Sequence, residues 1–158
     1  MRLYLTQHGL ALAKDVDSDR PLSEQGREDI QRLGDFLNKS SLRVEQVIHS
    51  GKTRAEQTAA ILAVTLLPDG QPQIRAGLSP EDPLESLSAE LAFWSADTLI
   101  VGHLPYVGRL ASLLLVSDPD RPTLAFRPGS MACIERDAAG HWTLLWMIRP
   151  ELLAGASG

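Results

Sequence analysis

This chain of 158 residues, with 44% hydrophobic and 22% charged side chains, has the composition of a globular domain, and folding removes roughly 70% of the surface of such a chain from water. The formal net charge of -5 argues against a nucleic-acid partner, because nucleic-acid binding depends on clustered Lys and Arg. Cys133 is the only cysteine, so we expect no intrachain disulfide and a cytoplasmic location, and no apolar run reaches the roughly 20 residues of a membrane span.

The first part of the chain predicts a strand and then an amphipathic helix. Residues 2–6 have mainly apolar and β-branched character and are followed by His8-Gly9, which is typical of a strand that ends in a turn. After a polar loop, Ser23 is suited to cap the start of a helix. Apolar residues then recur at three- and four-residue spacing, which predicts a helix of about four turns with one buried stripe. The stripe consists of Ile30, Leu33, Phe36 and Leu37.

The middle of the chain repeats this alternation of strand and helix. Residues 44–49 predict a second strand, and residues 54–67 predict a second helix that a Pro-Asp-Gly turn ends. Residues 73–78 are a candidate third strand, followed by a loop and a helix around residues 84–94. Residues 98–101 are an uninterrupted apolar run, which indicates a central strand covered on both faces.

The last part of the chain changes character. A helix that ends near Val116 is followed by two predicted strands, residues 131–136 and 142–148, with a hairpin turn between them. Because strand and helix alternate first and strand then follows strand, we predict an α/β layered fold with a mostly parallel sheet and an antiparallel addition. We expect one domain over residues 1–152 and a flexible tail over residues 153–158.

Three of the predicted segments begin or end in side chains that suit phosphate chemistry. His8 follows the first strand, Arg54 follows the second, and His103 follows the strand at residues 98–101. Ligands of open α/β sheets bind beyond the carboxyl ends of the strands, so these three side chains are predicted to converge at one edge. Neutral imidazole is a competent nucleophile near pH 7, and arginine offers paired donors to phosphate oxygens. Such a site needs no metal, because positioning and charge stabilisation do most of the work in phosphoryl transfer.

Four sequence blocks resemble, in order, motifs of the histidine phosphatase superfamily, and in particular of its short SixA-type branch. LTQHG at residues 5–9 resembles the Arg-His-Gly signature at the end of the first strand, with Gln7 in place of the arginine. DRPLS at residues 19–23 resembles the segment that follows in the short branch. SGKTRAEQT at residues 50–58 and VGHLPYVG at residues 101–108 resemble the blocks that carry the phosphate-binding arginine and the second active-site histidine.

The resemblance implies the phosphoglycerate mutase-like fold, a three-layer α/β/α sandwich, and catalysis without a metal or other cofactor. It implies that His8 attacks the phosphorus and becomes phosphohistidine, after which water releases inorganic phosphate. It assigns Arg54, Arg20 and His103 to the oxygens of the phosphoryl group, and we expect backbone amides near Gly9 to join the same anion site.

The resemblance does not settle which residue protonates the leaving group. Larger members of the family use an acidic residue on a mid-chain loop, and Glu81 and Asp82 lie at roughly that place, so both are candidate general acids. Phosphohistidine needs less help from such an acid, because its leaving imidazole can already carry a proton.

Gln7 is the departure from the family pattern that bears most on activity. Arginine would offer a charge-assisted fork, whereas glutamine offers neutral donors of about half the strength each, although we still expect Gln7 to line the phosphate site. Two interpretations follow. One is a slow or specialised phosphatase that compensates with another cation, for which Lys14 and Arg127 are candidates. The other is a non-catalytic relative that binds a phosphorylated partner.

The resemblance therefore predicts an enzyme that hydrolyses phosphohistidine on a protein such as a phosphotransfer domain. The short chain favours a protein substrate, because relatives that act on small phosphorylated metabolites usually insert lid segments for which this chain has little room. A small-molecule phosphomonoesterase is the alternative among enzymes. A phospho-ligand binding module without turnover is the alternative outside them.

Overall fold

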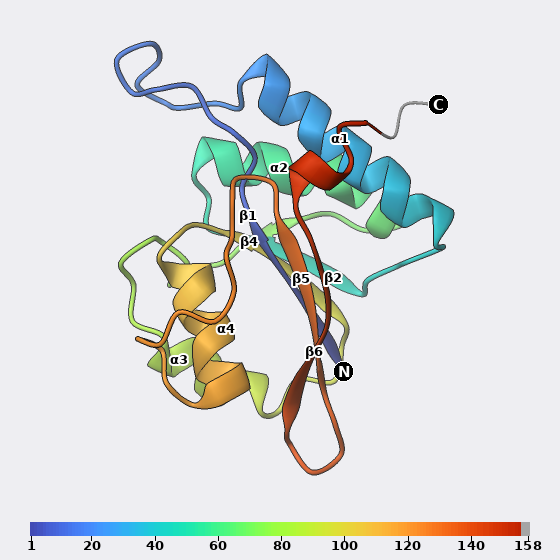
Figure 1. Ribbon diagram of the computed structural model, residues 1–158, viewed down its shortest axis with the longest axis vertical. Coiled ribbons are helices and arrows are strands. Elements are labelled where there is room, and N and C mark those ends of the chain that lie inside the picture. The colour runs from blue at the N-terminus through green and yellow to red at the C-terminus, as the bar shows by residue number, and fades with distance from the viewer. Residues whose placement is uncertain (156–158) are drawn as a thin grey trace.

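The computed structural model describes residues 1–155, and within these residues the backbone forms one six-stranded sheet with two α-helices on each face (Figure 1). The strands are β1 (Arg2–Gln7), β2 (Gln46–His49), β3 (Gln73–Ile74), β4 (Thr98–Gly102), β5 (Met131–Arg136) and β6 (Trp142–Ile148). The helices are α1 (Glu24–Lys39), α2 (Thr53–Leu66), α3 (Glu85–Leu91) and α4 (Tyr106–Val116), followed by the short 3-10 helix η1 (Pro150–Leu152).

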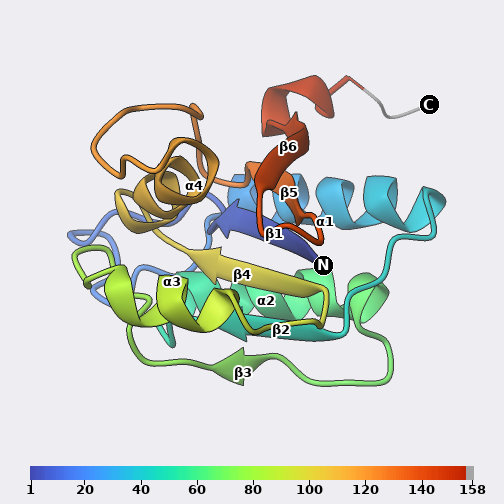
Figure 2. The ribbon, with the colours of Figure 1, turned by 90° about the horizontal axis from the view of Figure 1, so that it is seen from below.

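The strand order is β3-β2-β4-β1-β5-β6, and its two parts run in different directions (Figure 2). β3, β2, β4 and β1 pair in parallel, whereas β5 pairs antiparallel with both β1 and β6. This confirms the predicted fold class, a three-layer α/β/α arrangement with a mostly parallel sheet and an antiparallel addition.

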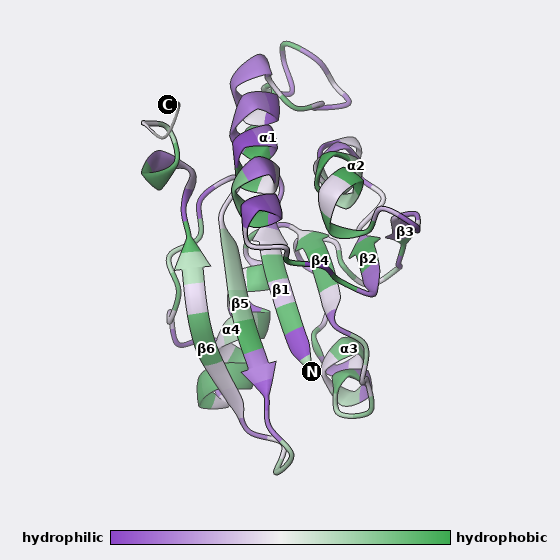
Figure 3. Cartoon of the chain, turned by 90° about the vertical axis from the view of Figure 1, so that its right-hand side faces the viewer, coloured by the Kyte–Doolittle hydropathy of each residue, from purple (hydrophilic) through white to green (hydrophobic). Residues whose placement is uncertain are grey.

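The strands alternate their side chains between two apolar cores, one on each face of the sheet, and Figure 3 shows hydrophobic stretches along them. In β1, Tyr4 packs under α1 and α2, while Leu3 and Leu5 pack under α3 and α4. β4 does the same with Leu99 and Ile100. Both faces of these central strands are therefore anchored, which fixes where their carboxyl ends lie.

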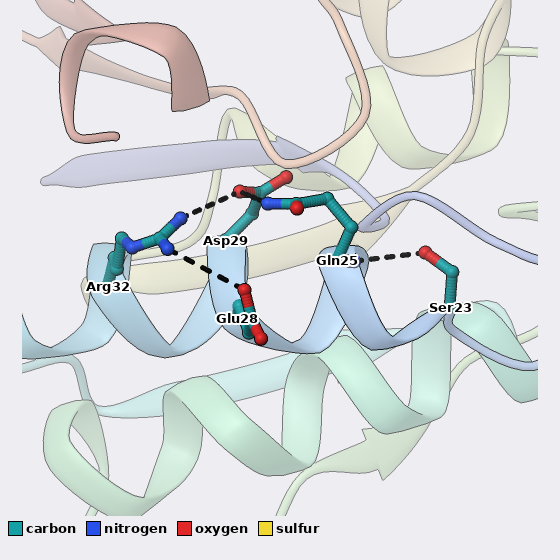
Figure 4. A network of polar contacts seen from close by, with 6 residues as sticks. Ser23, Gln25, Glu28, Asp29 and Arg32 are labelled. Atoms are coloured by element: carbon teal, nitrogen blue, oxygen red, sulfur yellow. Dashed lines mark hydrogen bonds and ion pairs between the residues drawn. The ribbon is translucent and has the colours of Figure 1, made fainter. Parts of the chain in front are cut away.

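Helix α1 begins as predicted at an N-cap. The Ser23 side chain accepts a hydrogen bond of 3.0 Å from the Gly26 amide, and ion pairs around Arg32 lie on the outer face of the helix (Figure 4). Three residues of the predicted stripe are buried, but Phe36 is 42% exposed. At 100° per residue Phe36 lies about 60° beyond Leu33, outside the face that meets the sheet.

One expectation about segment ends needs correction. The strand predicted over residues 73–78 is β3 alone, because it lies at the edge of the sheet and Gly77 turns the chain with a φ of 85°. Leu153, the first residue of the expected tail, is 8% exposed and belongs to the core under α1 and α2. Residues 156–158 of that tail lie outside the described residues. No helix within residues 1–155 is long and apolar enough to cross a membrane.

Candidate active site

The two candidate histidines and Arg54 are brought together by the parallel pairing of β1 and of β2 with the central strand β4. Gln7 lies beside Gly102 in that register, and the next amide, that of His8, donates a hydrogen bond of 2.9 Å to the Gly102 carbonyl. His103 follows directly, and the centroids of the two imidazole rings are 5.0 Å apart. Arg54 lies in the first turn of α2, and its Nε donates to His8 Nε2 at 3.3 Å. Three segments distant in sequence thus meet at one edge of the sheet.

The hydrogen bonds of His8 leave a lone pair on its Nε2 atom. Nδ1 lies 2.7 Å from the carbonyl oxygen of Gly9, which accepts hydrogen bonds only, so Nδ1 carries the proton. Nε2 is then the acceptor of the Arg54 hydrogen bond. Burial, opposed by the Gly9 carbonyl and reinforced by the charges of Arg54 and Arg20, lowers the pKa of His8 to about 4. The ring is therefore neutral near pH 7, the form in which imidazole is a nucleophile.

His103 is the more deeply buried of the two histidines, with 1% of its surface exposed. Its Nε2 lies 2.6 Å from the Ser50 hydroxyl, which fixes the orientation of the ring. Burial, followed by the neighbouring His8 ring and three cations, lowers the pKa of His103 to about 3. The cations are Arg54, Lys52 and Arg20. His103 is therefore a neutral hydrogen-bonding group near pH 7.

Arg20 and Arg54 supply positive charge around the histidines. The Nε of Arg20 donates to the Leu12 carbonyl at 3.1 Å, and the residue has a φ of 49° in the loop before α1. Burial and the charge of Arg20 lower the pKa of Arg54, which remains a cation near pH 7. Two guanidinium groups near two neutral imidazoles suit an anion with several oxygens. Within residues 1–155 no group of three or more His, Cys, Asp or Glu side chains is arranged to hold a metal ion.

The Gly9 amide has a hydrogen-bond partner within the protein. It donates a hydrogen bond of 3.0 Å to the Thr58 hydroxyl, which in turn donates to the Arg54 carbonyl at 2.7 Å. This amide is therefore used inside the protein, where Thr58 holds the loop after β1 against α2. A Cβ on Gly9 would lie 2.8 Å from a side-chain carbon of Ile30, so the absence of a side chain allows α1 to pack close to the site.

Gln7 is buried in the site, with 8% of its surface exposed. Its backbone is fixed on both sides, since its amide donates to the Ser130 carbonyl at 3.2 Å and its carbonyl accepts from the Gly129 amide at 3.1 Å. Its side-chain Oε1 is buried and has no hydrogen-bond partner within residues 1–155. A neutral amide with unused hydrogen-bonding capacity thus occupies the position at which the family signature has an arginine.

The candidate general acids are not joined to the histidines by hydrogen bonds in the described part of the chain. The Asp82 carboxylate accepts a hydrogen bond of 2.8 Å from the Ser79 amide and so closes its own loop. Burial raises the pKa of Tyr106 most, and the negative charge of Asp82 raises it further. The Asp82 carboxylate therefore lies near the start of α4. Glu81 is exposed on the same loop. The assignment of either residue as the acid stays a prediction.

Arg127 and Lys14, which the sequence suggested as substitutes for an arginine at position 7, lie in two different parts of the structure. Arg127 forms an ion pair of 3.5 Å with Glu151, near the end of the described chain. Lys14 is exposed in the loop before α1. The structure instead identifies Ser50, Lys52 and Thr58 as neighbours of the site. All three lie with Arg54 in the block at residues 50–58.

Comparison with known proteins agrees with this geometry. The family model of the histidine phosphatase superfamily (branch 1) matches residues 3–79. Phosphohistidine phosphatase SixA of Escherichia coli (strain K12) is 28% identical over 155 residues, which cover 95% of this chain and 94% of that protein. An uncharacterised protein of Picosynechococcus sp. (strain ATCC 27264 / PCC 7002 / PR-6) is 34% identical over 121 residues, covering 72% of this chain and 73% of its own.

Solved structures show the same fold. The structure of the protein histidine phosphatase SixA complexed with tungstate has a TM-score of 0.84 and 28% sequence identity, and the match covers 97% of this chain and 99% of that chain. The alpha-ribazole phosphatase of Shigella flexneri matches over 95% of this chain and 97% of its own with a TM-score of 0.71, but at 17% identity it shows the fold alone. The similarity to SixA supports the activity of a phosphatase, and the chain belongs to the histidine phosphatase superfamily.

Proposed function

We propose that this protein is a metal-independent phosphatase that removes the phosphoryl group from phosphohistidine on a protein, with His8 as the nucleophile. The observation that carries the proposal is the state of His8. Its Nδ1 proton is held by the Gly9 carbonyl, and its Nε2 lone pair accepts a hydrogen bond from the cation Arg54, which would pass to a phosphoryl oxygen when the lone pair attacks. A neutral imidazole oriented in this way beside fixed positive charge is suited to attack phosphorus.

In the first step, His8 Nε2 forms a bond to phosphorus while the bond from phosphorus to the leaving nitrogen breaks. The leaving nitrogen takes the electron pair, and an imidazole that is protonated on its other nitrogen leaves as the neutral ring. Arg54, Arg20 and His103 hold the oxygens of the phosphoryl group as charge redistributes over them. The phosphoryl group is then carried on His8, whose Nδ1 proton still donates to Gly9.

In the second step, a water oxygen attacks the same phosphorus and the bond to His8 Nε2 breaks. The electron pair returns to Nε2, the water gives up one proton to solvent or to the phosphate, and inorganic phosphate leaves. The low pKa of His8 favours this return to the neutral ring. No net proton is left on the enzyme, so the cycle is ready to repeat.

Two observations support phosphohistidine rather than a phosphate ester as the substrate. First, the chain is similar to a phosphohistidine phosphatase over 94% of that protein's length. Second, an ester needs a proton on its leaving oxygen, whereas Asp82 is bonded to its own loop and Glu81 is exposed. A protonated imidazole leaves without such an acid. The partner would then be a protein that carries phosphohistidine.

The test is release of phosphate from a histidine-phosphorylated phosphotransfer protein, with and without a chelator. We expect release that survives the chelator and falls by about 10³-fold or more in His8→Ala. His141→Ala is the matched control, because His141 lies in the exposed turn between β5 and β6. Turnover that equals wild type in His8→Ala would refute the assignment.

A substrate series separates the remaining alternatives. Equal rates on phosphohistidine protein and on a simple phosphomonoester would contradict the substrate class and favour a small-molecule phosphomonoesterase. Binding of the phosphorylated protein without any release would make the site, with Gln7 in it, a phospho-ligand binding module instead of an enzyme.

A further inference from the structure

The replacement of arginine by Gln7 leaves the phosphate site with one cation fewer than the signature provides. Several other cations already have carboxylate partners within residues 1–155. Arg127 pairs with Glu151, and Arg75 pairs with Glu90 at 2.8 Å and lies over the Trp94 ring. A cation that replaces the missing charge should be near the histidines and not already bound to a carboxylate.

Lys52 meets both conditions. Gly51, with a φ of 88°, turns the chain after β2, and Lys52 is then the N-cap residue of α2, two positions before Arg54. The Lys52 amide donates to the Ser50 hydroxyl at 3.3 Å, and the same hydroxyl lies 2.6 Å from His103 Nε2. The backbone of Lys52 is therefore joined to His103 through one side chain.

The side chain of Lys52 is available to a ligand. The residue is exposed, and no ion pair joins it to a carboxylate within residues 1–155. Its charge is also among those that lower the pKa of His103, after burial, His8 and Arg54. A lysine ammonium is a compact charge on a flexible stem, so it can approach an anion from the rim of a site without a fixed position in the empty state.

We propose that Lys52 is a phosphate-binding residue of this site and supplies the positive charge that Gln7 cannot. The proposal rests on the proposed function only in that the site binds a phosphoryl group. It explains how a site with a neutral residue at position 7 retains three cations, namely Arg20, Arg54 and Lys52. Because the ammonium is mobile, Lys52 acts on binding and on the developing charge without the bidentate geometry of arginine.

The test measures binding of inorganic phosphate and of tungstate by calorimetry, which does not depend on turnover of any substrate. We expect Lys52→Ala to weaken binding about tenfold, or about 1.4 kcal/mol, and Lys52→Arg to retain it, because the first variant loses the charge-assisted contact and the second keeps it. Lys39→Ala is the matched control, since Lys39 is exposed in the last turn of α1. Thermal unfolding of each variant checks that the fold is intact.

A double-mutant cycle tests whether Lys52 replaces the arginine in particular. In a Gln7→Arg background, we expect Lys52→Ala to cost less than about threefold in phosphate affinity, because the signature cation is then present. In the wild-type background, the His103 ring should titrate at a higher pH after Lys52→Ala, which nuclear magnetic resonance can follow. A merely structural N-cap residue would not produce this pair of results.

Three results would overturn the proposal. One is phosphate affinity in Lys52→Ala within about twofold of wild type, as in the Lys39→Ala control. Another is an equal loss in both backgrounds, which would mean that Lys52 does not replace the arginine. The third is a loss confined to the Michaelis constant for the protein substrate, with unchanged phosphate affinity, which would make Lys52 a contact to the partner's surface. Failure of phosphohistidine turnover alone would refute the proposed substrate but leave these binding results to decide the role of Lys52.

Discussion

The two parts of the sheet differ in what they contribute to the site. The parallel part, β3-β2-β4-β1, ends at one edge in His8 and His103, and α2 brings Arg54 to the same edge. The antiparallel part, β5 and β6, contributes no candidate catalytic side chain. The turn just before β5 reaches the site through its backbone, where the Ser130 carbonyl accepts from the Gln7 amide and the Gly129 amide donates to the carbonyls of Gln7 and His8.

The difference shows that strand direction decides which segments carry the chemistry. Parallel strands present all their carboxyl ends, and the helix starts that follow, at one edge. An antiparallel strand beside them runs the other way, so β5 begins where β1 ends and continues into the core. Its value to the protein is the apolar area that it buries, with Met131, Cys133 and Ile134 fully buried. Substitutions at the edge of the parallel part should therefore lower activity, whereas substitutions in the antiparallel part should mainly lower the free energy of unfolding.

The largest effect on stability without an effect on chemistry is expected in the antiparallel part. Ile134 is fully buried in the core under α3 and α4, so Ile134→Ala should lower the free energy of unfolding by about 2–5 kcal/mol. Denaturant unfolding measures the loss, and phosphate release well below the melting temperature should stay near wild type. A tenfold loss of activity in the folded variant would contradict the division between the two parts.

The next effect belongs to the parallel part and depends on pH. The pKa of His8 is about 4 in the folded protein, below the ordinary value of 6.5, so the unfolded chain binds more protons between these values. Stability should be fully present above about pH 6.5 and fall as pH drops toward 4, by on the order of 3 kcal/mol for His8. Between pH 7 and 4.5, the free energy of unfolding should change less with pH in His8→Asn than in wild type.

Ile134→Ala is the control for this pH dependence, because it removes apolar contacts and no titrating group. Its destabilisation should be the same across the pH range. The same ionisation should appear in kinetics, where kcat/KM decreases by about tenfold per pH unit below the pKa of the free His8 ring. If the free energy of unfolding of His8→Asn falls with pH as steeply as that of wild type, other groups produce the acid sensitivity of the fold.

The smallest effect compares two glycines in α1. A Cβ on Gly26 would overlap the carbonyl oxygen of Leu10, which also accepts hydrogen bonds from Ser23, so Gly26→Ala should displace the loop after His8 and cost about 1–3 kcal/mol. Gly34→Ala meets only an ordinary contact of 3.6 Å to Thr65 and should be neutral or stabilising by up to about 1 kcal/mol. Thermal unfolding and phosphate release measure both. Equal behaviour of the two variants would show that the site tolerates a shift of this loop.

The amino-acid sequence was enough to predict the order of the elements and the site residues that lie at the ends of strands and helices. Periodicity of apolar residues and turn residues predicted the strands and helices, because these patterns reflect local geometry. The four blocks that resemble family motifs pointed to His8, Arg54 and His103, and the structure brings these three together. Phe36 was misjudged because it lies about 60° beyond Leu33 on the helix, outside the face that meets the sheet.

The hydrogen bonds that hold the site residues in place could not be predicted from the sequence and are visible only in the tertiary structure. The Gly9 amide is bound to Thr58, 49 positions away in sequence, and His103 is bound to Ser50, 53 positions away. Such hydrogen bonds leave no periodic pattern in the sequence, because each depends on two segments that meet only after the sheet has formed. For the same reason, the proposal that Lys52 supplies the missing charge depends on the tertiary structure, which places the turn after β2 beside His103.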